Sequence, residues 1–443
     1  MNKWDAGLLP PEGRVVAGFS GGADSTALAH WLLGQVGRER LLLAHVNHGL
    51  RGTESARDED HARAFAQKWG LALKVRRADV GALAKEEGSG LEECGRRVRY
   101  AFFESLATGE YDCICTAHTA DDNVETLLLH LSRGASLQGL CGIPAKRGRV
   151  LRPLLAVTRE EVEAYCACQG LSYVTDSSNL SLNYARNRVR QQVAPVLRAI
   201  NPQFTAAACR AIQQLSCDRD YLEGEAAKLL EGARRPYGLS CRALREAHPS
   251  LQGRALRQYL AAAGCQDVEE KHIALAAQLL TQDGGLSLPG GVQAMSGLGL
   301  FYAQVPAAFE GFALPAALGE TPLPGGRRLV LEKIYGGKPG NRGKIQNLLF
   351  KNGLDYATIY GTSQSAAPLI ARTRRPGDRF APAGRGVTKP LKQVLREAGI
   401  PPWAREQVVL LEKAGQLVYC QGVGAAEGFA PQPGAARLAV QIT

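Results

Sequence analysis

Residues 20 to 25, which read S-G-G-A-D-S, combine two adjacent glycines with two hydroxyls and one carboxylate. An apolar stretch precedes them, and a second apolar stretch with the composition of a helix follows. Glycines let backbone N–H groups converge on an anion, and the first turn of a helix adds its positive dipole end. The segment is neither G-x-x-x-x-G-K-[ST] nor G-x-G-x-x-G. It therefore predicts a phosphate loop of another kind, the alternative being a plain strand-turn-helix connection capped by Asp24 or a serine.

Asp121, Asp122 and Glu125 form a second group of residues with chemical potential. Their spacing brings the carboxylates together at the start of a predicted helix, directly after His118. Acids in a first helical turn also stabilise the helix dipole without any further role. At an ATP site Mg²⁺ takes one or two carboxylates with phosphate oxygens, and an amino-acid ammonium also needs a carboxylate. The group predicts a cation or ammonium site, and both assignments stay open for each carboxylate.

Two further sets of polar residues lie between these segments. Glu92, Arg96 and Arg99 share one face of a predicted helix, which is either a solvated Glu–Arg pair or a cationic face turned to phosphate. His45 and His48 lie at the end of a predicted strand, where histidines have a structural role more often than a catalytic one.

The elements that must position these residues alternate between strand and helix. Apolar runs predict strands at Val15–Phe19, Leu41–Val46, Leu71–Val75 and Cys113–Ala117, with helices at about Ser25–Val36, Glu54–Gly70 and Ala120–Ser132. This alternation favours a Rossmann-like parallel sheet with helices on both faces. Ligands of such sheets bind at the carboxyl ends of the strands, near the switch in strand order. The loop and the acidic helix are therefore expected at one site.

The remainder of the chain predicts a helical domain and a small mixed α/β C-terminal domain. A hairpin is expected around Pro289, at the end of a series of amphipathic helices. The predicted divisions are 1–215 for the α/β domain with a helical extension, 216–305 for a helical substrate-binding domain, 306–365 for a linker region of uncertain order, and 366–443 for a basic C-terminal domain.

The composition bounds the class of protein. A net charge of +11 over 443 residues suits a polyanionic partner such as nucleic acid, or else an ordinary solvated basic surface. The 11 cysteines are scattered and include no C-x-x-C pair, which favours a reducing cytoplasm over a disulfide framework. No apolar run approaches the ~18 residues of a membrane span, and the N-terminal residues do not resemble a signal peptide. We therefore expect a cytoplasmic protein without a membrane partner.

Several segments together give a specific resemblance. "SGGADS", "HVNHGLRGTES", "LEECGRRVRY", "TAHTADDNVETLLLHLSRG" and "DSSNLSLNYARNRVR" occur in this order, followed by "TRRPGDRFAPAGRGVTKPLKQVLREAGIPPWARE". Together they resemble the tRNA(Ile)-lysidine synthetases of the PP-loop ATP pyrophosphatase superfamily. The resemblance implies ligation of free L-lysine to C2 of the wobble cytidine in a tRNA(Ile) with a CAU anticodon. The cytidine is first adenylated, and ATP is consumed to AMP and pyrophosphate.

The resemblance also implies roles for individual residues. ATP is expected at Ser20, Gly21, Gly22, Ala23, Asp24, Ser25, Arg96 and Arg99, with Asp24 as the candidate ligand of Mg²⁺. The catalytic candidates are Asp24, His48, His118 and Asp122, and the lysine-binding candidates are Asp121, Asp122 and Glu125. The candidates for tRNA contact, all in strongly basic stretches, are Arg186, Arg188, Arg190, Arg374, Arg379, Lys389 and Lys392.

Three other functions compete with this interpretation. A tRNA thiolase of the same superfamily would typically need a C-x-x-C pair, which is missing from the sequence. A non-catalytic nucleic-acid-binding protein has no use for Asp24 or the carboxylates at 121–125. A metabolic amide synthetase does not explain the two basic stretches. The sequence leaves the oligomeric state open, a homodimer included.

Overall fold

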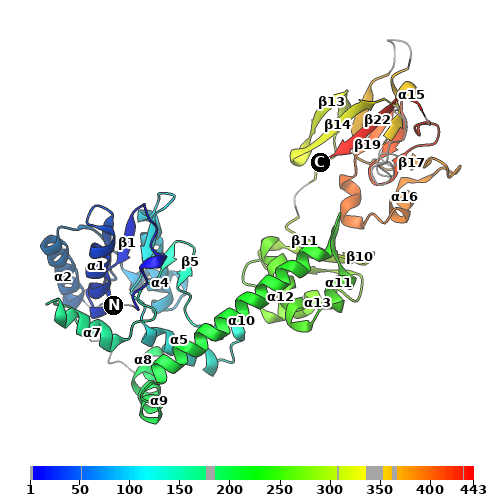
Figure 1. The fold of residues 1–443 in the computed structure, drawn as a ribbon. Helices are drawn as coiled ribbons and strands as arrows, with labels where there is room; N and C mark the ends of the chain where they lie inside the picture. The colour runs from blue at the N-terminus through cyan, green and yellow to red at the C-terminus, as the bar shows by residue number, and fades with distance from the viewer. Residues whose placement is uncertain are drawn as a thin grey trace. The chain divides into compact units, whose positions relative to one another are not determined.

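A computed structural model of the chain describes residues 3–50, 52–175, 185–306, 309–335, 353–361, 367–432 and 434–443 (Figure 1). The chain divides into two compact units, Met1–Tyr221 and Leu222–Thr443. No helix in the described part of the chain combines the length and apolar character needed to cross a membrane.

The first unit is built on a six-stranded sheet that is parallel except at one edge. Its strands are β1 (Val15–Gly18), β2 (Leu41–Asn47), β3 (Ala72–Arg77), β4 (Cys113–Cys115), β5 (Lys146–Arg147) and β6 (Val150–Leu151), in the order β3-β2-β1-β4-β6-β5. Only β5 pairs antiparallel with its neighbour. Because β2 and β4 flank β1, the strand order switches beside β1, which is where such sheets bind ligands. The predicted parallel α/β sheet is confirmed.

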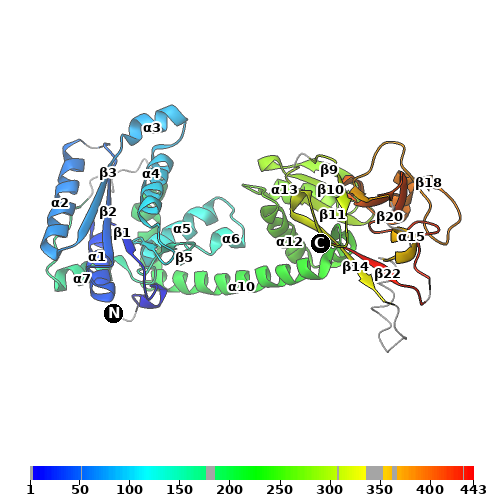
Figure 2. The ribbon, with the colours of Figure 1, turned by 90° about the horizontal axis from the view of Figure 1, so that it is seen from above.

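Helices cover both faces of this sheet, as Figure 2 shows from a second direction. The bounds are α1 (Ala23–Val36), α2 (Thr53–Trp69), α3 (Val80–Glu87), α4 (Leu91–Leu106) and α7 (Arg159–Cys168). Side chains alternate across β1, so Val15 and Ala17 join a core with α1, α2 and α7, while Val16 joins a second core with α4. The first helix therefore starts at the carboxyl end of the central strand.

The helical extension of this unit begins at the neighbouring strand. It comprises α5 (Ala120–Ser132), α6 (Leu137–Leu140), α8 (Ala185–Arg188), a π-type turn (Val189–Val193), α9 (Ala194–Ile200) and the start of α10 (Phe204–Ala233). A capping box fixes the start of α5, because the Thr119 hydroxyl accepts from the Asp122 N–H and the Asp122 carboxylate accepts from the Thr119 N–H. The acidic residues thus lie in the first turns of a helix that follows β4.

The second unit opens with a domain of helices and strands. Helices α11 (Cys241–Glu246), α12 (Pro249–Ala262) and α13 (Glu270–Gln278) share a core with a sheet of order β7-β8-β11-β10-β9, formed by Arg234–Arg235, Gly238–Ser240, Leu300–Gln304, Gln293–Gly297 and Gly284–Ser287. Strands β9 and β10 pair antiparallel across Pro289–Gly291, so the predicted hairpin is confirmed. The segment predicted as helical therefore also contains a sheet.

The C-terminal part of this unit contains two further sheets over a shared apolar core. One has the order β12-β16-β19-β20-β21, formed by Ala313–Ala316, Leu369–Arg372, Leu410–Lys413, Gln416–Cys420 and Gly424–Ala425. The other has the order β13-β14-β22-β15, formed by Gly319–Leu323, Arg327–Ile334, Arg437–Ile442 and Gly353–Asp355. The segment 306–365, predicted as a linker, therefore supplies strands that pair with β16 and β22. Residues 307–308, 336–352 and 362–366 of that segment lie outside the described residues.

Candidate active site

The S-G-G-A-D-S loop connects β1 to α1, and hydrogen bonds within the loop fix its shape. Gly21 has a φ of +86°, in the left-handed region that favours glycine. The Ser25 hydroxyl donates to the Gly22 carbonyl at 3.0 Å and accepts from the Ser20 N–H at 3.1 Å. Gly22 is the N-cap of α1, and no side chain caps the helix there. The first N–H groups of α1 are therefore available to an anion, as the sequence predicts.

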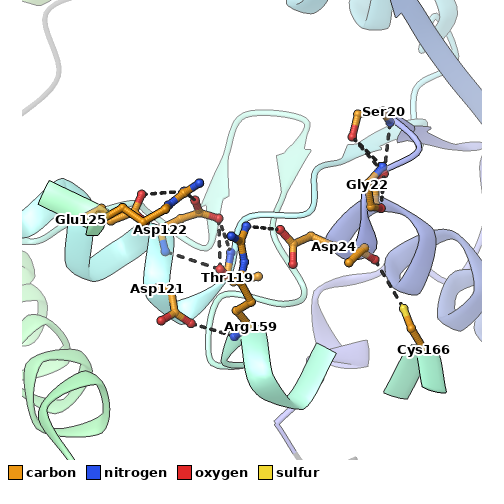
Figure 3. Close-up of polar contacts among 12 residues, drawn as sticks. Ser20, Gly22, Asp24, Thr119, Asp121, Asp122, Glu125, Arg159 and Cys166 are labelled. Carbon is orange, nitrogen blue, oxygen red and sulfur yellow. Dashed lines mark hydrogen bonds and ion pairs between the residues drawn. The ribbon is translucent and has the colours of Figure 1, made fainter. Parts of the chain in front are cut away.

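Asp24 lies in the first turn of α1 and faces the neighbouring helix α7 (Figure 3). Its Oδ2 accepts a hydrogen bond from Nη2 of Arg159 at 3.1 Å, whereas its Oδ1 is buried without a hydrogen-bond partner. Burial raises the pKa of Asp24, and the charge of Arg159 opposes this shift without cancelling it. The carboxylate thus carries one satisfied oxygen and one oxygen that still lacks a partner.

Asp122 is held from two sides at the start of α5. Its Oδ2 accepts from the Thr119 N–H at 2.9 Å, and its Oδ1 accepts from Nη2 of Arg186 at 3.0 Å. Burial alone would raise the pKa of Asp122, but Arg186, the Thr119 N–H and further positive groups outweigh it and lower the pKa. Asp122 is therefore a stable carboxylate rather than a proton donor.

Glu125 is buried between two arginines one turn further along α5. Nε of Arg186 donates to its Oε2 at 2.8 Å, and Arg190 donates to both oxygens, at 2.5 and 2.9 Å. The side chain of Glu125 is only 4% exposed. Arg186 and Arg190 come from α8 and the π-type turn, where they were predicted to contact tRNA, and Arg188 between them is exposed. The structure thus turns two of these three arginines toward the acidic helix.

Asp121 connects the acidic helix to two other elements. Its Oδ2 accepts from the backbone N–H of Arg159 at 2.7 Å, and its Oδ1 pairs with Arg198 of α9. Because the side chain of the same Arg159 reaches Asp24, one residue joins the phosphate loop to the acidic helix (Figure 3). The two groups predicted from the sequence therefore lie at one site in the first unit.

His118 lies on the short connection between β4 and α5. Its Nδ1 lies 3.0 Å from the hydroxyl of Thr116. Burial, opposed by Asp122 but reinforced by Arg152 and other arginines, lowers the pKa of His118 to about 4. The imidazole is therefore neutral at neutral pH. It lies close enough to Arg96 for that charge to contribute to the shift.

His48 and the predicted phosphate-binding arginines are associated with α4. A Cβ added at Gly95 would lie 3.7 Å from Cε1 of His48, so the imidazole packs over this glycine. The Arg96 guanidinium stacks on the ring of Tyr100 at 4.9 Å, and the side chain of Arg99 is exposed. Neither arginine forms a salt bridge with an acid within the described residues, although the charge of Glu92 acts on Arg99. The guanidinium groups of both arginines are thus not tied up in a salt bridge with a described acid.

Arg159 is the residue of this site that the sequence reasoning missed. It occupies the first position of α7, where a positive charge opposes the helix dipole. That unfavourable placement is the one local signal that could have pointed to a partner outside the helix. The partner itself, 135 residues earlier in the chain, is visible only in the fold.

The four predicted tRNA contacts of the second unit differ in their surroundings. Arg374 pairs with Glu406 at 3.1 Å, and Lys389 pairs with Glu397 at 2.8 Å. Arg379 donates to the carbonyl of Thr388 at 3.1 Å. Lys392 is exposed on α16 (Leu391–Glu397), and no acidic partner for it occurs among the residues that are described.

Comparison with known proteins assigns the chain in three parts. Residues 5–197 match the PP-loop domain, residues 239–294 match the TilS substrate binding domain, and residues 369–442 match the TilS substrate C-terminal domain.

The described metal-ligating side chains include no group of three or more that could hold a metal ion by themselves.

Curated relatives match over almost the whole chain. The tRNA(Ile)-lysidine synthase of Geobacillus kaustophilus is 32% identical, over 97% of this chain and 95% of the relative. That of Geobacter sulfurreducens is 32% identical, over 98% and 94%. That of Ralstonia nicotianae is 34% identical, over 93% and 88%. On these grounds, and with the phosphate loop at its switch point, the chain belongs to the tRNA(Ile)-lysidine synthase family.

Proposed function

We propose that this chain ligates free L-lysine to C2 of the wobble cytidine in a tRNA(Ile) with a CAU anticodon, through an adenylated cytidine, with release of AMP and pyrophosphate. The observation that carries the proposal is the pairing of the phosphate loop with the arginine-held carboxylates of α5 through Arg159. One site then contains groups for a triphosphate and groups for an amino acid. The relatives named as lysidine synthases and the absent C-x-x-C pair favour this reaction over tRNA thiolation.

ATP fits the loop, and Mg²⁺ fits Asp24. The uncapped N-terminus of α1 and the left-handed Gly21 form a backbone cradle for phosphate oxygens. Oδ1 of Asp24 is buried without a hydrogen-bond partner, and such a carboxylate oxygen is a suitable ligand for a cation. Because Mg²⁺ is usually held by one or two carboxylates together with phosphates, three clustered acids are not required. When bound, Mg²⁺ would neutralise charge on the phosphates.

The cluster on α5 matches a zwitterionic amino acid. Carboxylates of Asp121, Asp122 and Glu125 suit an ammonium, and the guanidinium groups of Arg186 and Arg190 suit a carboxylate. Since these groups already neutralise one another in the structure, lysine would exchange ion pairs with them rather than enter an uncompensated acidic pocket. We assign Asp122 to this exchange because its low pKa keeps it ionised.

The chemistry requires activation, because the C2 oxygen of cytosine is a poor leaving group. Attack of that oxygen on the α-phosphorus of ATP breaks the α–β bond, releases pyrophosphate and leaves AMP on the oxygen. The neutral side-chain amine of lysine then attacks C2, AMP departs with the oxygen, and the nitrogen gives up one proton. We assign Arg96 and Arg99 to the charge of the leaving phosphates, and His118 or His48 to proton acceptance. The neutral imidazole of His118 has the acceptor form that this role needs.

The proposed contacts to tRNA fall on both units. Arg188 is exposed, whereas any contact of Arg186 or Arg190 with tRNA would compete with Glu125. The second unit adds positive charge from Lys392, Arg374, Arg379 and Lys389.

The eleven free cysteines fit a cytoplasmic protein.

The proposal is tested with radiolabelled lysine, ATP and a transcript of tRNA(Ile) carrying the CAU anticodon. We expect label to enter the tRNA only when ATP is present, with AMP formed in equal amount. A transcript in which the wobble cytidine is replaced by uridine is the matched control and should take up no label. Absence of label from the tRNA, or lysine uptake without AMP, would overturn the assignment.

A further inference from the structure

The ion pair between Asp24 and Arg159 occupies the position where a cation is needed. Nη2 of Arg159 lies 3.1 Å from Oδ2 of Asp24, and the carboxylate is mostly buried, with 21% of its side chain exposed. Its second oxygen has no hydrogen-bond partner. In this state the guanidinium supplies the positive charge that the proposed function assigns to Mg²⁺.

The backbone of Arg159 is fixed, while its side chain has room to move. The backbone N–H donates to Asp121 at 2.7 Å, and a capping box between Thr158 and Glu161 fixes the first turn of α7. The side chain is 38% exposed, and its one hydrogen-bonded partner within the described residues is Asp24. The guanidinium can therefore leave Asp24 without disturbing the helix that carries it.

Electrostatic repulsion determines whether Arg159 or Mg²⁺ pairs with Asp24. A Mg²⁺ ion held by Asp24 would repel the guanidinium that now pairs with the same carboxylate, so the two compete for Asp24. ATP carries about four negative charges and attracts the same arginine. We propose that Arg159 is a nucleotide-binding residue that acts as the counter-ion of Asp24 until the phosphates of ATP draw it away, which frees the carboxylate for Mg²⁺. This proposal rests on the function proposed above.

Two consequences follow for binding. Without nucleotide, the guanidinium keeps the cation out of the site. With nucleotide, the guanidinium moves to the phosphates, and cation and nucleotide stabilise each other's binding. By thermodynamic linkage, the factor by which ATP raises cation affinity equals the factor by which the cation raises ATP affinity, so Arg159 changes both factors equally. Arg159 thus couples the loading of the two.

The test uses the full chain with Mn²⁺, followed by electron paramagnetic resonance, and α,β-methylene-ATP, followed by calorimetry. For Arg159→Ala we expect affinity for Mn²⁺ alone to rise at least tenfold and affinity for the metal-free nucleotide to fall at least tenfold. Arg159→Lys, which keeps the charge, should stay within about threefold of the natural chain on both. Arg147→Ala is the matched control, since it removes one exposed arginine from the same unit.

The opposite signs of the two shifts separate this role from a structural one, because a loosened site would lose affinity for both ligands. The proposal is overturned if Arg159→Ala binds Mn²⁺ alone no more tightly than the natural chain, or binds the nucleotide equally well. If the natural chain itself fails to bind the nucleotide, the proposed function fails as well. Normal nucleotide binding in the natural chain with an unchanged Arg159→Ala variant overturns the exchange alone.

Discussion

Arg190 donates to both carboxylate oxygens of Glu125, from Nε at 2.5 Å and from Nη2 at 2.9 Å. The acid belongs to α5 and the arginine to a π-type turn 65 residues later, so the pair ties two parts of the helical extension together. Such π-type turns frequently occur at functional sites. The pair lies in the same cluster as Asp122, which Arg190 also approaches at 3.4 Å.

Removal of the charge at Glu125 should therefore destabilise the first unit. In Glu125→Gln, two arginines lose the buried carboxylate that compensates them, and breaking a buried pair of this kind costs about 3–5 kcal/mol. Calorimetric unfolding of the full chain measures this as a lower temperature for one transition. Glu160→Gln, an exposed acid in the first turn of α7, should change stability by less than about 0.5 kcal/mol. Equal stability of the two variants would contradict the role given to Glu125.

Much of this fold is predictable from local pattern. The strand at 15–18, the glycine loop and the helix from Ala23 follow from an apolar run, two glycines and a helical period, and each is found within two or three residues of its predicted bounds. The acidic helix starts at Ala120, as predicted, because Thr119 caps it. Hydrophobic periodicity and capping act over a few residues and are therefore visible in the sequence.

Features set by pairing between distant segments were not predictable. Strand β14 forms a hairpin with the adjacent β13, but its pairing with β22, more than 100 residues later, is not visible in the sequence. Arg159 looked like an ordinary helix residue, and Arg186 and Arg190 looked like solvent-facing basic residues. Their acidic partners, Asp24 and Glu125, are adjacent only after the sheet has formed. Charge composition gives the sign of a surface, not the partner of each charge.

Asp24→Asn is expected to abolish AMP formation that depends on lysine and tRNA. The substitution keeps the shape of the side chain but removes the charge on the unpartnered oxygen that faces the proposed cation. Affinity for tRNA should stay within about twofold, because Asp24 is not among the residues proposed to contact tRNA, such as the exposed Arg188. Pyrophosphate release and filter binding measure the two effects. Normal turnover in this variant would refute the assignment of the loop.

Lys392 and Lys389 should differ in their contribution to tRNA binding. Lys392 is exposed without an acidic partner among the described residues, whereas Lys389 is held by both oxygens of Glu397 at 2.8 Å. A lysine that contacts a phosphate adds about one to the slope of log affinity against log salt concentration. We expect Lys392→Ala to lower that slope by about one and Lys389→Ala to lower it by less.

The salt titration needs a control of equal charge in the same unit. Lys271→Ala serves, since this lysine pairs with Glu269 at 2.9 Å and lies outside the basic C-terminal stretch. Its slope should match that of the natural chain. If Lys392→Ala gives the same slope as this control, Lys392 does not contact tRNA. Any contact between residues 372–405 and tRNA would then have to come from the other lysines and arginines of that segment.

The histidine beside the acidic helix should make the first unit sensitive to mild acid. The pKa of His118 falls from its ordinary 6.5 to about 4, chiefly through burial. Between these two values the unfolded chain binds more protons than the folded one, so stability falls as pH drops from 6.5 to 4 and this group adds no further loss below 4. The loss is at most about 3 kcal/mol. His118→Asn should flatten the decline of the unfolding temperature over this window. An identical decline in the variant would show that other buried groups, such as His45, carry the acid sensitivity.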